Sequence, residues 1–242
     1  MNKAFVEKLL ESKLTGPAMN AAEGLRLLGY EVVWFDREDY SKLEITKDTL
    51  VVGLINTYVD SISSLGIEMQ NFDYPDELSP WLGRKIAQKQ IGEVRKESNS
   101  WPVFIKPANE RKTFTGQLVS KFADLISSAT LPKDFLVWAS EPVRFVSEYR
   151  CFILNGEVVG CKNYKGDVLV FPDSKAITDM VAAWKSAPKA YCLDVGVTDN
   201  GQTLLVEVND AHSAGDYGLH PIIYARFLEA RWCELTGASP IP

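Results

Sequence analysis

The sequence contains few of the residues that mark a zinc-binding or disulfide-stabilised protein. Its 242 residues include two histidines and four cysteines, and no cysteines stand in a CxxC pair, so zinc-finger spacing is absent. Three of the four cysteines lie in apolar, strand-like runs, which favours small buried side chains in a reducing compartment. The cysteines are Cys151, Cys161, Cys192 and Cys233.

Long apolar runs and an excess of basic charge are also missing. No stretch approaches the length of a membrane-spanning helix, and the N-terminus lacks the apolar core of a signal peptide. We therefore predict a cytoplasmic protein with no membrane partner. The net charge of −6 argues against a general nucleic-acid binder, because such a protein needs a basic face to neutralise phosphates.

The order of predicted elements indicates a mixed α/β (α+β) protein. No internal repeat is present, and the length fits one large domain or two small ones. The first part is a small α/β unit without a glycine-rich dinucleotide fingerprint. The Pro- and Asp-rich segment 71–80 is predicted to be a linker, which divides the chain into domains 1–78 and 79–242.

Periodicity and helix-stop signals predict the individual elements. Helices are expected over residues 18–28, 60–65, 81–95, 116–128 and 221–235. Strands are expected over residues 31–35, 50–55, 103–105, 135–139, 149–154, 158–161, 191–197 and 204–208.

The sharpest local signal is a hairpin centred on Asn200-Gly201, a dipeptide typical of a two-residue type I′ turn. That turn places Asp194 directly opposite Glu207. Because side chains alternate along strands, Asp194, Glu207 and Asn209 share one face of the ribbon with Gly196 and Leu205. The other face is predicted to be apolar core, made of Leu193, Val195, Val197, Leu204, Val206 and Val208.

Two interpretations of this acidic pair are open. Like charges directly opposite each other destabilise a ladder, and a divalent cation would remove that cost. Carboxylate and amide oxygens, completed by phosphate oxygens and water, suit Mg²⁺. Alternatively, the pair lies on a solvent-facing side where the repulsion is screened.

Asp194 followed thirteen residues later by Glu207-Val208-Asn209 in "LLVEVND" resembles the metal motif of the ATP-grasp superfamily. "PVFIKP" resembles the strand whose lysine, here Lys106, contacts the nucleotide phosphates. "WASEPVRFVSEYRCFI" resembles the hinge strand and the ribose-contacting glutamate. The resemblance implies that Glu141 and Val143 frame the adenine and that Glu148 holds the ribose. It covers roughly residues 81–235 and implies an ATP-grasp fold preceded by a Rossmann-like pre-ATP-grasp domain.

Most ATP-grasp enzymes place two lysines on the phosphates, and this chain departs from that pattern. Arg84 in "WLGRKI" stands where the first lysine would be, and Arg150 follows the ribose glutamate. This resembles a phage and bacterial branch marked by two arginines and one lysine, once catalogued as a domain of unknown function. The resemblance implies phosphate contacts by Arg84, Lys106 and Arg150, catalytic roles for Lys106 and Arg150, and ATP and Mg²⁺ as cofactors.

The reaction implied by the family is an ATP-dependent carboxylate–amine ligation that forms ADP. A carboxylate attacks the γ-phosphate to give an acylphosphate, and an amine or similar nucleophile then displaces phosphate. A phosphotransferase that stops after phosphorylation and a non-catalytic ATP-binding module are the alternatives. The acid and amine are small molecules or peptides of unknown identity. The oligomeric state is open, with a homodimer among the alternatives.

Each candidate side chain also has an ordinary structural interpretation. Lys106 could merely end a strand and reach water. Arg150 lies on a second predicted hairpin, whose Asn155-Gly156 turn places it opposite Cys161, and it could pair with Glu148 on its own strand. Glu141 and Glu148 would otherwise be surface acids.

The residues that follow the metal motif, and one loop before it, stay open as well. His212 could bind substrate, move a proton or make only structural hydrogen bonds, and Ser213, Asp216 and Tyr217 are open in the same way. The segment 109–116 either closes over phosphates or is a plain loop.

Overall fold

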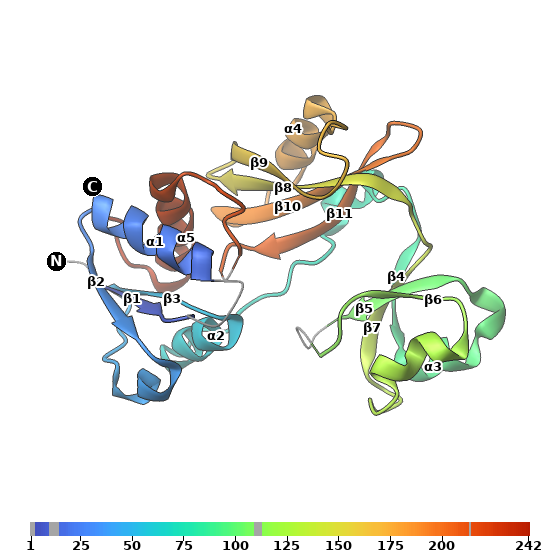
Figure 1. Cartoon of the computed structure of the whole chain (residues 1–242), viewed down its shortest axis with the longest axis horizontal. Coiled ribbons are helices and arrows are strands. Elements are labelled where there is room, and N and C mark those ends of the chain that lie inside the picture. The colour runs from blue at the N-terminus through green and yellow to red at the C-terminus, as the bar shows by residue number, and fades with distance from the viewer. Residues whose placement is uncertain (1–2, 10–14, 109–112, 213) are drawn as a thin grey trace.

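The structure, a computed structural model, describes residues 3–9, 15–108, 113–212 and 214–242. It contains three sheets (Figure 1). A parallel sheet and three helices form one end of the molecule, an antiparallel sheet forms the other end, and a long antiparallel sheet lies between and above them. In the part of the chain that is described, no helix is long and apolar enough to cross a membrane.

The N-terminal sheet has three parallel strands in the order β2-β1-β3. The C-terminal helix α5 packs onto this unit, and its Ala225 and Trp232 share a core with Leu25 and Ile62. The helices α1 and α5 meet closely at Gly24, where a Cβ atom would lie 2.0 Å from the Pro221 carbonyl oxygen. The bounds are β1 Lys3–Glu7, α1 Thr15–Leu27, β2 Glu31–Phe35, η1 Arg37–Lys42, β3 Thr49–Val52, α2 Ile55–Ser64 and α5 Pro221–Thr236.

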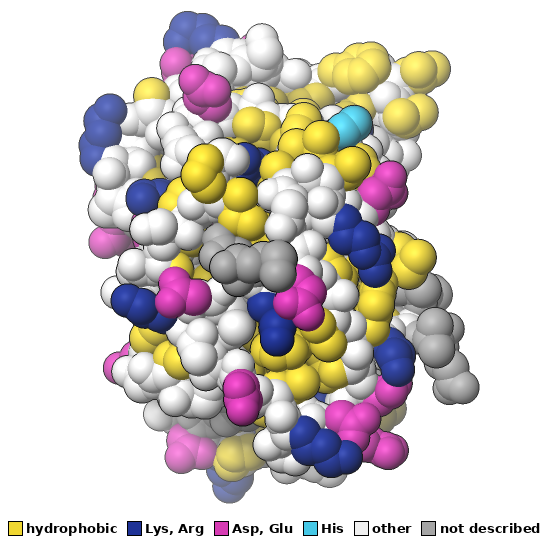
Figure 2. All heavy atoms as spheres, turned by 90° about the vertical axis from the view of Figure 1, so that its left-hand side faces the viewer, with side chains coloured by type: hydrophobic (Ala, Val, Ile, Leu, Met, Phe, Trp, Pro, Cys, Tyr) yellow, Lys and Arg dark blue, Asp and Glu magenta, His cyan; other side chains and the backbone are white. Residues whose placement is uncertain are grey.

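Charged side chains of both signs are interspersed over the face formed by this end of the molecule (Figure 2). Apolar side chains lie between them rather than forming a separate band. The domain division at residue 78 stays a prediction. The contact between α1 and α5 shows that elements from the two ends of the sequence share one core.

The sheet formed by the middle of the sequence, here called the middle sheet, is antiparallel in the order β4-β7-β5-β6. Its core lies between the sheet and short helices and includes Ile91, Ile105 and Val137. The bounds are η2 Asp76–Trp81, β4 Ile86–Gln90, α3 Ile91–Lys96, η3 Ser98–Ser100, β5 Val103–Pro107, β6 Gln117–Val119, η4 Phe122–Ser128 and β7 Leu136–Ser140.

Two predicted helices are wrong in this unit. Residues 81–95 instead leave a 3-10 helix at Trp81, turn at Gly83 with a φ of 61°, and pair with β7 as strand β4. Only the end of the segment is helical, because the side chain of Gln90 and that of Glu93 form a capping box that starts α3. Residues 116–128 contain β6 and the 3-10 helix η4, which Asp124 begins by accepting hydrogen bonds from the Ser120 and Lys121 amides.

The third sheet is antiparallel in the order β11-β10-β8-β9. Alternation along its strands gives it two different faces. One face packs under η2 and α4 through Tyr149, Cys151 and Leu193. The opposite face packs on α5 at one end, through Phe152 and Cys192, and carries charged side chains at the other. The bounds are β8 Phe145–Leu154, β9 Glu157–Gly166, α4 Ser174–Ala183, β10 Ala190–Thr198 and β11 Thr203–Asp210.

Candidate nucleotide and metal site

The hairpin of β10 and β11 places Asp194 opposite Glu207, as predicted, but through a different turn. Asn200 does not have a positive φ, and only Gly201 does, at 82°. The Gly201 amide donates to the Thr198 carbonyl at 3.0 Å and the Thr198 amide to the Gln202 carbonyl at 2.9 Å, which is a three-residue loop with a glycine bulge. The predicted type I′ turn is therefore wrong.

A second irregularity restores the predicted pairing. The three-residue loop shifts the ladder by one residue, and a bulge between Asp194 and Val195 shifts it back. Leu205 consequently lies in the core at 0 % exposure, whereas Leu204 and Val206 are only half-buried. The prediction that Leu204 and Val206 are core residues is wrong, because the bulge turns Leu205 inward instead.

The second hairpin behaves in the opposite way. Asn155 and Gly156 have φ values of 51° and 80°, as a type I′ turn requires. A bulge beyond Phe152 then shifts the ladder, so that Arg150 lies opposite Lys162 and Cys161 lies opposite Cys151. The predicted pairing of Arg150 with Cys161 is wrong for this reason. Cys161 is exposed, contrary to the expectation for its residue type, while Cys151 and Cys192 are buried.

The three predicted metal ligands converge on the charged face of the third sheet. The Asn209 amide nitrogen lies 3.1 Å from Asp194 Oδ2 and 3.1 Å from Glu207 Oε1. Within the described ranges, no cluster of three or more His, Cys, Asp or Glu side chains could hold a metal ion. The donor set here is two carboxylates and an amide. Such hard oxygens fit Mg²⁺ that is completed by phosphate and water oxygens, with the amide turned so that its oxygen faces the ion.

Each carboxylate also has a cationic partner. Arg150 makes a two-pronged contact with Asp194, from Nε to Oδ1 at 2.8 Å and from Nη2 to Oδ2 at 2.7 Å. Lys106 Nζ donates to Glu207 Oε2 at 2.6 Å. Arg150 therefore pairs with an acid on the neighbouring strand, not with Glu148. Lys106 is not a lysine that reaches open water, since its side chain is only 12 % exposed.

Burial and charge shift the pKa values of these groups in different directions. Burial, reinforced by the Glu207 carboxylate, raises the pKa of Asp194 against the opposing influence of Arg150. Burial also disfavours charge on Glu207, but Lys106 outweighs it and lowers the pKa of Glu207. Burial likewise opposes charge on Lys106, but Glu207, Tyr74 and Asp73 outweigh it and raise the pKa of Lys106. Asp194 is thus the carboxylate that would gain most from a further cation.

The predicted nucleotide-binding residues line one cavity of about 610 Å³ between the middle and third sheets, within the range of small-molecule sites. Glu141 and Val143 come from the segment that joins β7 to β8. Glu141 accepts a hydrogen bond from the Lys85 amide at 2.9 Å. Glu148 accepts from Tyr164 Oη at 2.8 Å. The predicted contacts Arg84, Lys106, Glu141, Val143 and Glu148 all border this cavity.

Arg84 lies in the cavity wall but uses its guanidinium to hold backbone. It donates to the carbonyl oxygens of Leu82 and Leu205 at 2.8 Å each and to that of Val206 at 3.0 Å. Burial lowers the pKa of Arg84, and Tyr74 and Glu207 oppose that effect. Arg84 therefore fixes the bulged part of β11 beside the cavity.

A second cavity of about 670 Å³ lies on the other side of Lys106. Lys106, Gly116 and Glu207 border both cavities. The second cavity is also lined by Asn71, Asp73, Thr115, Arg150, Asn209, His212 and Tyr217. Of the predicted loop 109–116, residues 109–112 lie outside the described residues, as does Ser213.

His212 lies at the wall of this second cavity and is 4 % exposed. Its ring stacks on Tyr58 with centroids 4.8 Å apart, and its Nδ1 lies 3.0 Å from Asp210 Oδ1. Asp210 is held in turn by Arg231. Both interpretations of His212, substrate contact and structural support, are compatible with this position.

Tyr217 and Asp216, which the sequence leaves open, lie in different surroundings. The Tyr217 ring lies 5.2 Å from the Arg150 guanidinium, at the edge of the second cavity. Asp216 instead accepts a hydrogen bond from Asn20 Nδ2 on α1 at 2.6 Å. Tyr217 is therefore a neighbour of the site, whereas Asp216 holds its loop to the N-terminal unit.

Sequence reasoning did not identify Asp73 or Tyr74 as neighbours of the site. Both lie in the segment interpreted as a linker. They contact Lys106 by an ion pair at 2.7 Å and by a ring whose centroid is 4.5 Å away. No local spacing links these residues to Lys106, so the sequence carries no signal for the contact.

Comparison with solved structures identifies the fold. D-cycloserine synthetase aligns with a TM-score of 0.62 at 11% identity, over 94% of this chain and 97% of the other. D-alanine–D-alanine ligase from Bacillus anthracis aligns with a TM-score of 0.60 at 16% identity, over 97% and 96%. A macrocyclase from Microcystis aeruginosa, bound to its precursor peptide, aligns with a TM-score of 0.55 at 11% identity, over 98% and 100%. The chain has the ATP-grasp fold.

The family is more specific than the fold. Residues 81–227, more than half of the chain, match an ATP-grasp domain family, the second family of the clade named for two arginines and one lysine. The chain belongs to this family, and the resemblance drawn from the sequence is confirmed. No curated protein matches the chain.

Proposed function

We propose that the chain is an ADP-forming ATP-grasp ligase that activates a carboxylate as an acylphosphate and joins it to an amine. The observation that supports this most directly is that two cavities meet at Lys106 and Glu207. One cavity is lined by the residues proposed to bind nucleotide. The other is suited to an acceptor, because it opens beside the same lysine and carboxylate.

The proposed nucleotide site orients ATP so that its phosphates reach this common wall. Glu141 and Val143 border the adenine, and Glu148 accepts from the ribose hydroxyls. Lys106 and Arg150 donate to phosphate oxygens, with Arg84 beside them. Lys106 acts as a point charge, whereas Arg150 offers a planar fork that matches two oxygens.

Asp194, Glu207 and Asn209 would hold Mg²⁺, which neutralises charge that develops on the phosphates. In the structure the same carboxylates are paired with Arg150 and Lys106. Binding of Mg²⁺ and ATP together would let the carboxylates take the metal and the cations take the phosphates. This exchange leaves every buried charge with a partner, whereas either ligand alone would leave one unpaired.

The chemistry then follows in two balanced steps. A substrate carboxylate oxygen bonds to the γ-phosphorus as the bond to the β,γ-bridging oxygen breaks and ADP leaves. The amine nitrogen then bonds to the acyl carbon, phosphate leaves with the electrons of the broken C–O bond, and the amine loses a proton. Lys106 and Arg150 stabilise charge on the transferred phosphoryl group in the first step.

The substrates proposed are a carboxylic acid and an amine, either small molecules or peptides. A screen of ADP release over pairs of acids and amines, with mass spectrometry of the products, tests this. A ligase releases ADP and phosphate only when both partners are present, and forms an amide. A stable phosphorylated acid with no need for amine would show a phosphotransferase instead. Tight ATP binding with no turnover on any pair would show a binding module.

A further inference from the structure

Lys106 lies between two carboxylates. Its Nζ donates to Glu207 Oε2 at 2.6 Å and to Asp73 Oδ1 at 2.7 Å. The Tyr74 ring covers it, with the ring centroid 4.5 Å from Nζ. Because the lysine side chain is only 12 % exposed, its charge depends on these neighbours rather than on water.

Asp73 is itself fixed by three other contacts. Trp138 Nε1 donates to Asp73 Oδ2 at 3.0 Å, and Asn71 Nδ2 donates to the same oxygen at 2.7 Å. The Asp73 carbonyl accepts a hydrogen bond from the Val208 amide at 2.9 Å. The linker is thereby attached both to β7 of the middle sheet and to β11, next to Glu207.

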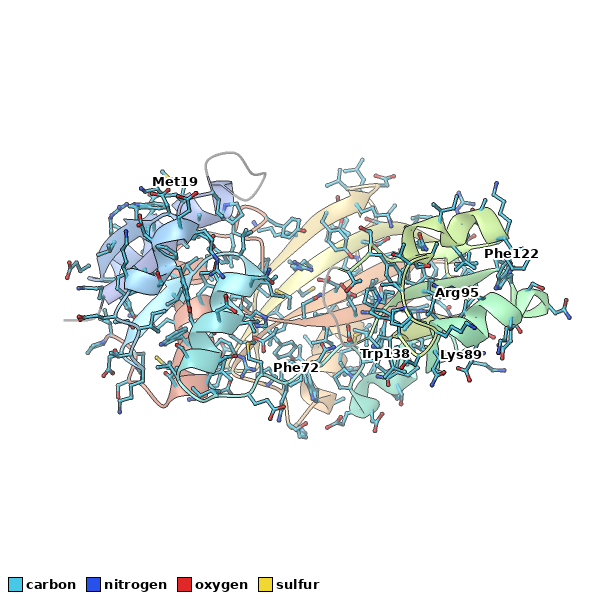
Figure 3. The ribbon with its side chains drawn as sticks, turned by 90° about the horizontal axis from the view of Figure 1, so that it is seen from below. Met19, Phe72, Lys89, Arg95, Phe122 and Trp138 are labelled. Carbon is cyan, nitrogen blue, oxygen red and sulfur yellow. The ribbon has the colours of Figure 1, made fainter. Side chains whose placement is uncertain are left out.

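Neighbouring aromatic side chains hold the same segment. Phe72, labelled with Trp138 in Figure 3, packs edge-on against Trp184 at a centroid distance of 5.4 Å. Tyr74 packs edge-on against Trp138 at 5.1 Å. Asp73 therefore has a fixed position beside Lys106 that does not depend on Glu207.

The two carboxylates have different tasks if the proposed function holds. Glu207 cannot keep Lys106 and also bind a divalent cation, because the cation takes the carboxylate oxygens and repels the ammonium group. A buried lysine that loses its only carboxylate is costly. Asp73 removes that cost, since it stays with Lys106 when Glu207 changes partner.

We propose, on the basis of the proposed function, that Asp73 is a positioning residue that retains Lys106 at the wall between the two cavities while Glu207 exchanges the lysine for a metal ion. Asp73 belongs to the linker, outside the residues 81–227 that match the family. The linker thus completes the site rather than merely joining two parts of the chain.

Divalent-cation affinity tests this proposal without turnover, with Mn²⁺ as the probe. Binding is followed by the electron paramagnetic resonance signal of free Mn²⁺, without nucleotide, and by calorimetry in the presence of ADP. The variants are Asp73→Asn, which keeps the size and removes the charge, and Asp73→Glu, which keeps the charge. Asp76→Asn is the matched control, because Asp76 is an exposed acid three residues along the same segment.

We expect Asp73→Asn to weaken Mn²⁺ binding about tenfold, since Lys106 is then held by Glu207 alone. Asp73→Glu should recover part of this loss, and Asp76→Asn should stay within about twofold of the unchanged chain. Urea denaturation of each variant establishes that it is folded.

A double-mutant cycle with Lys106→Met separates positioning from a general charge effect. Lys106→Met frees Glu207 and should strengthen Mn²⁺ binding without nucleotide. In that background Asp73→Asn should have a clearly smaller effect. The proposal is overturned if Asp73→Asn does not weaken binding, or weakens it by the same factor with and without Lys106.

One outcome separates this inference from the function beneath it. If the unchanged chain binds Mn²⁺ and the Asp73 variants match it, only the role of Asp73 is rejected. If the unchanged chain binds Mn²⁺ neither alone nor with ADP, the metal site fails, and the positioning role is rejected with it.

Discussion

Two arginine–aspartate pairs lie on the third sheet and differ in what surrounds the arginine. Arg150 on β8 grips Asp194 on β10 through two hydrogen bonds. Arg231 on α5 grips Asp210 on β11 through Nε, at 2.9 and 3.0 Å, and through Nη2, at 2.6 Å. Both aspartates are buried. Arg150, however, lines the second cavity, whereas Arg231 lies 5.5 Å from the Phe72 ring, is 5 % exposed and borders neither of the two cavities.

The pKa values of the two aspartates differ in the same sense. Burial opposes charge on Asp210, but His212 and Arg231 outweigh it and lower the pKa of Asp210. At Asp194 burial outweighs Arg150, and the pKa is raised. The same pair of residue types therefore forms a closed structural contact in one place and a contact that is open to exchange in the other. Access to a cavity separates the two, not burial.

The largest effect is expected from breaking the closed pair. Arg231→Met leaves Asp210 buried with its principal partner removed, which costs about 3–5 kcal/mol of unfolding free energy. Arg150→Met should cost less than half of this, because water can reach Asp194 through the cavity. Urea denaturation measures both. Asp210→Asn added to Arg231→Met should recover part of the loss, and equal costs for the two arginine variants would erase the distinction.

The open pair should control chemistry instead. Asp194→Asn keeps the shape of the side chain but removes a proposed metal ligand, so ATP turnover should fall by about 10²–10³-fold while the chain stays folded. ADP release under the conditions of the substrate screen measures this. Asp199→Asn is the control, because Asp199 is an exposed acid at the tip of the same hairpin. Turnover of Asp194→Asn at the native rate would remove Asp194 from the site.

The sequence predicts the acidic pair because its ingredients are local. Alternation along β10 and β11 and a turn signal near Asn200 are enough to bring Asp194 opposite Glu207. The predicted type of turn is wrong, and a bulge compensates for the one-residue error. The bulge itself has no signal in the sequence, since it depends on how Leu205 packs against the rest of the sheet.

The partners of these acids are beyond local reasoning. Asp194 meets Arg150 because β10 pairs with β8, and Lys106 meets Asp73 because the linker crosses the middle sheet. Arg231 and Asp210 come together only when α5 packs on the third sheet. Residues 86–90 have a pattern that resembles a helix, and they form β4 instead because pairing with β7 overrides that pattern.

Acid should expose the closed pair through the pH dependence of stability. The folded-state pKa of Asp210 is lowered, so its contribution is present above the ordinary value of about 3.9 and is lost as the pH falls through the folded value. The groups that face Asp210 are His212 and Arg231, with Glu234 beyond the arginine. Unfolding free energy measured on acidification should drop less steeply below about pH 4 in Asp210→Asn than in the unchanged chain. An unchanged slope would mean that other carboxylates cause the acid sensitivity.

The smallest effect is expected at the outer edge of the closed pair. Arg231 Nη1 also donates to Glu234 at 2.7 Å, and the Glu234 side chain is 27 % exposed. Glu234→Gln removes the charge but keeps an acceptor for the Lys189 amide, which lies 3.0 Å from both oxygens. Because solvent screens such a pair, the unfolding free energy should fall by about 0.2–1 kcal/mol, and nucleotide binding should not change. A loss as large as that of Arg231→Met would instead show that Glu234 holds the arginine, and that Asp210 is not the centre of a closed contact.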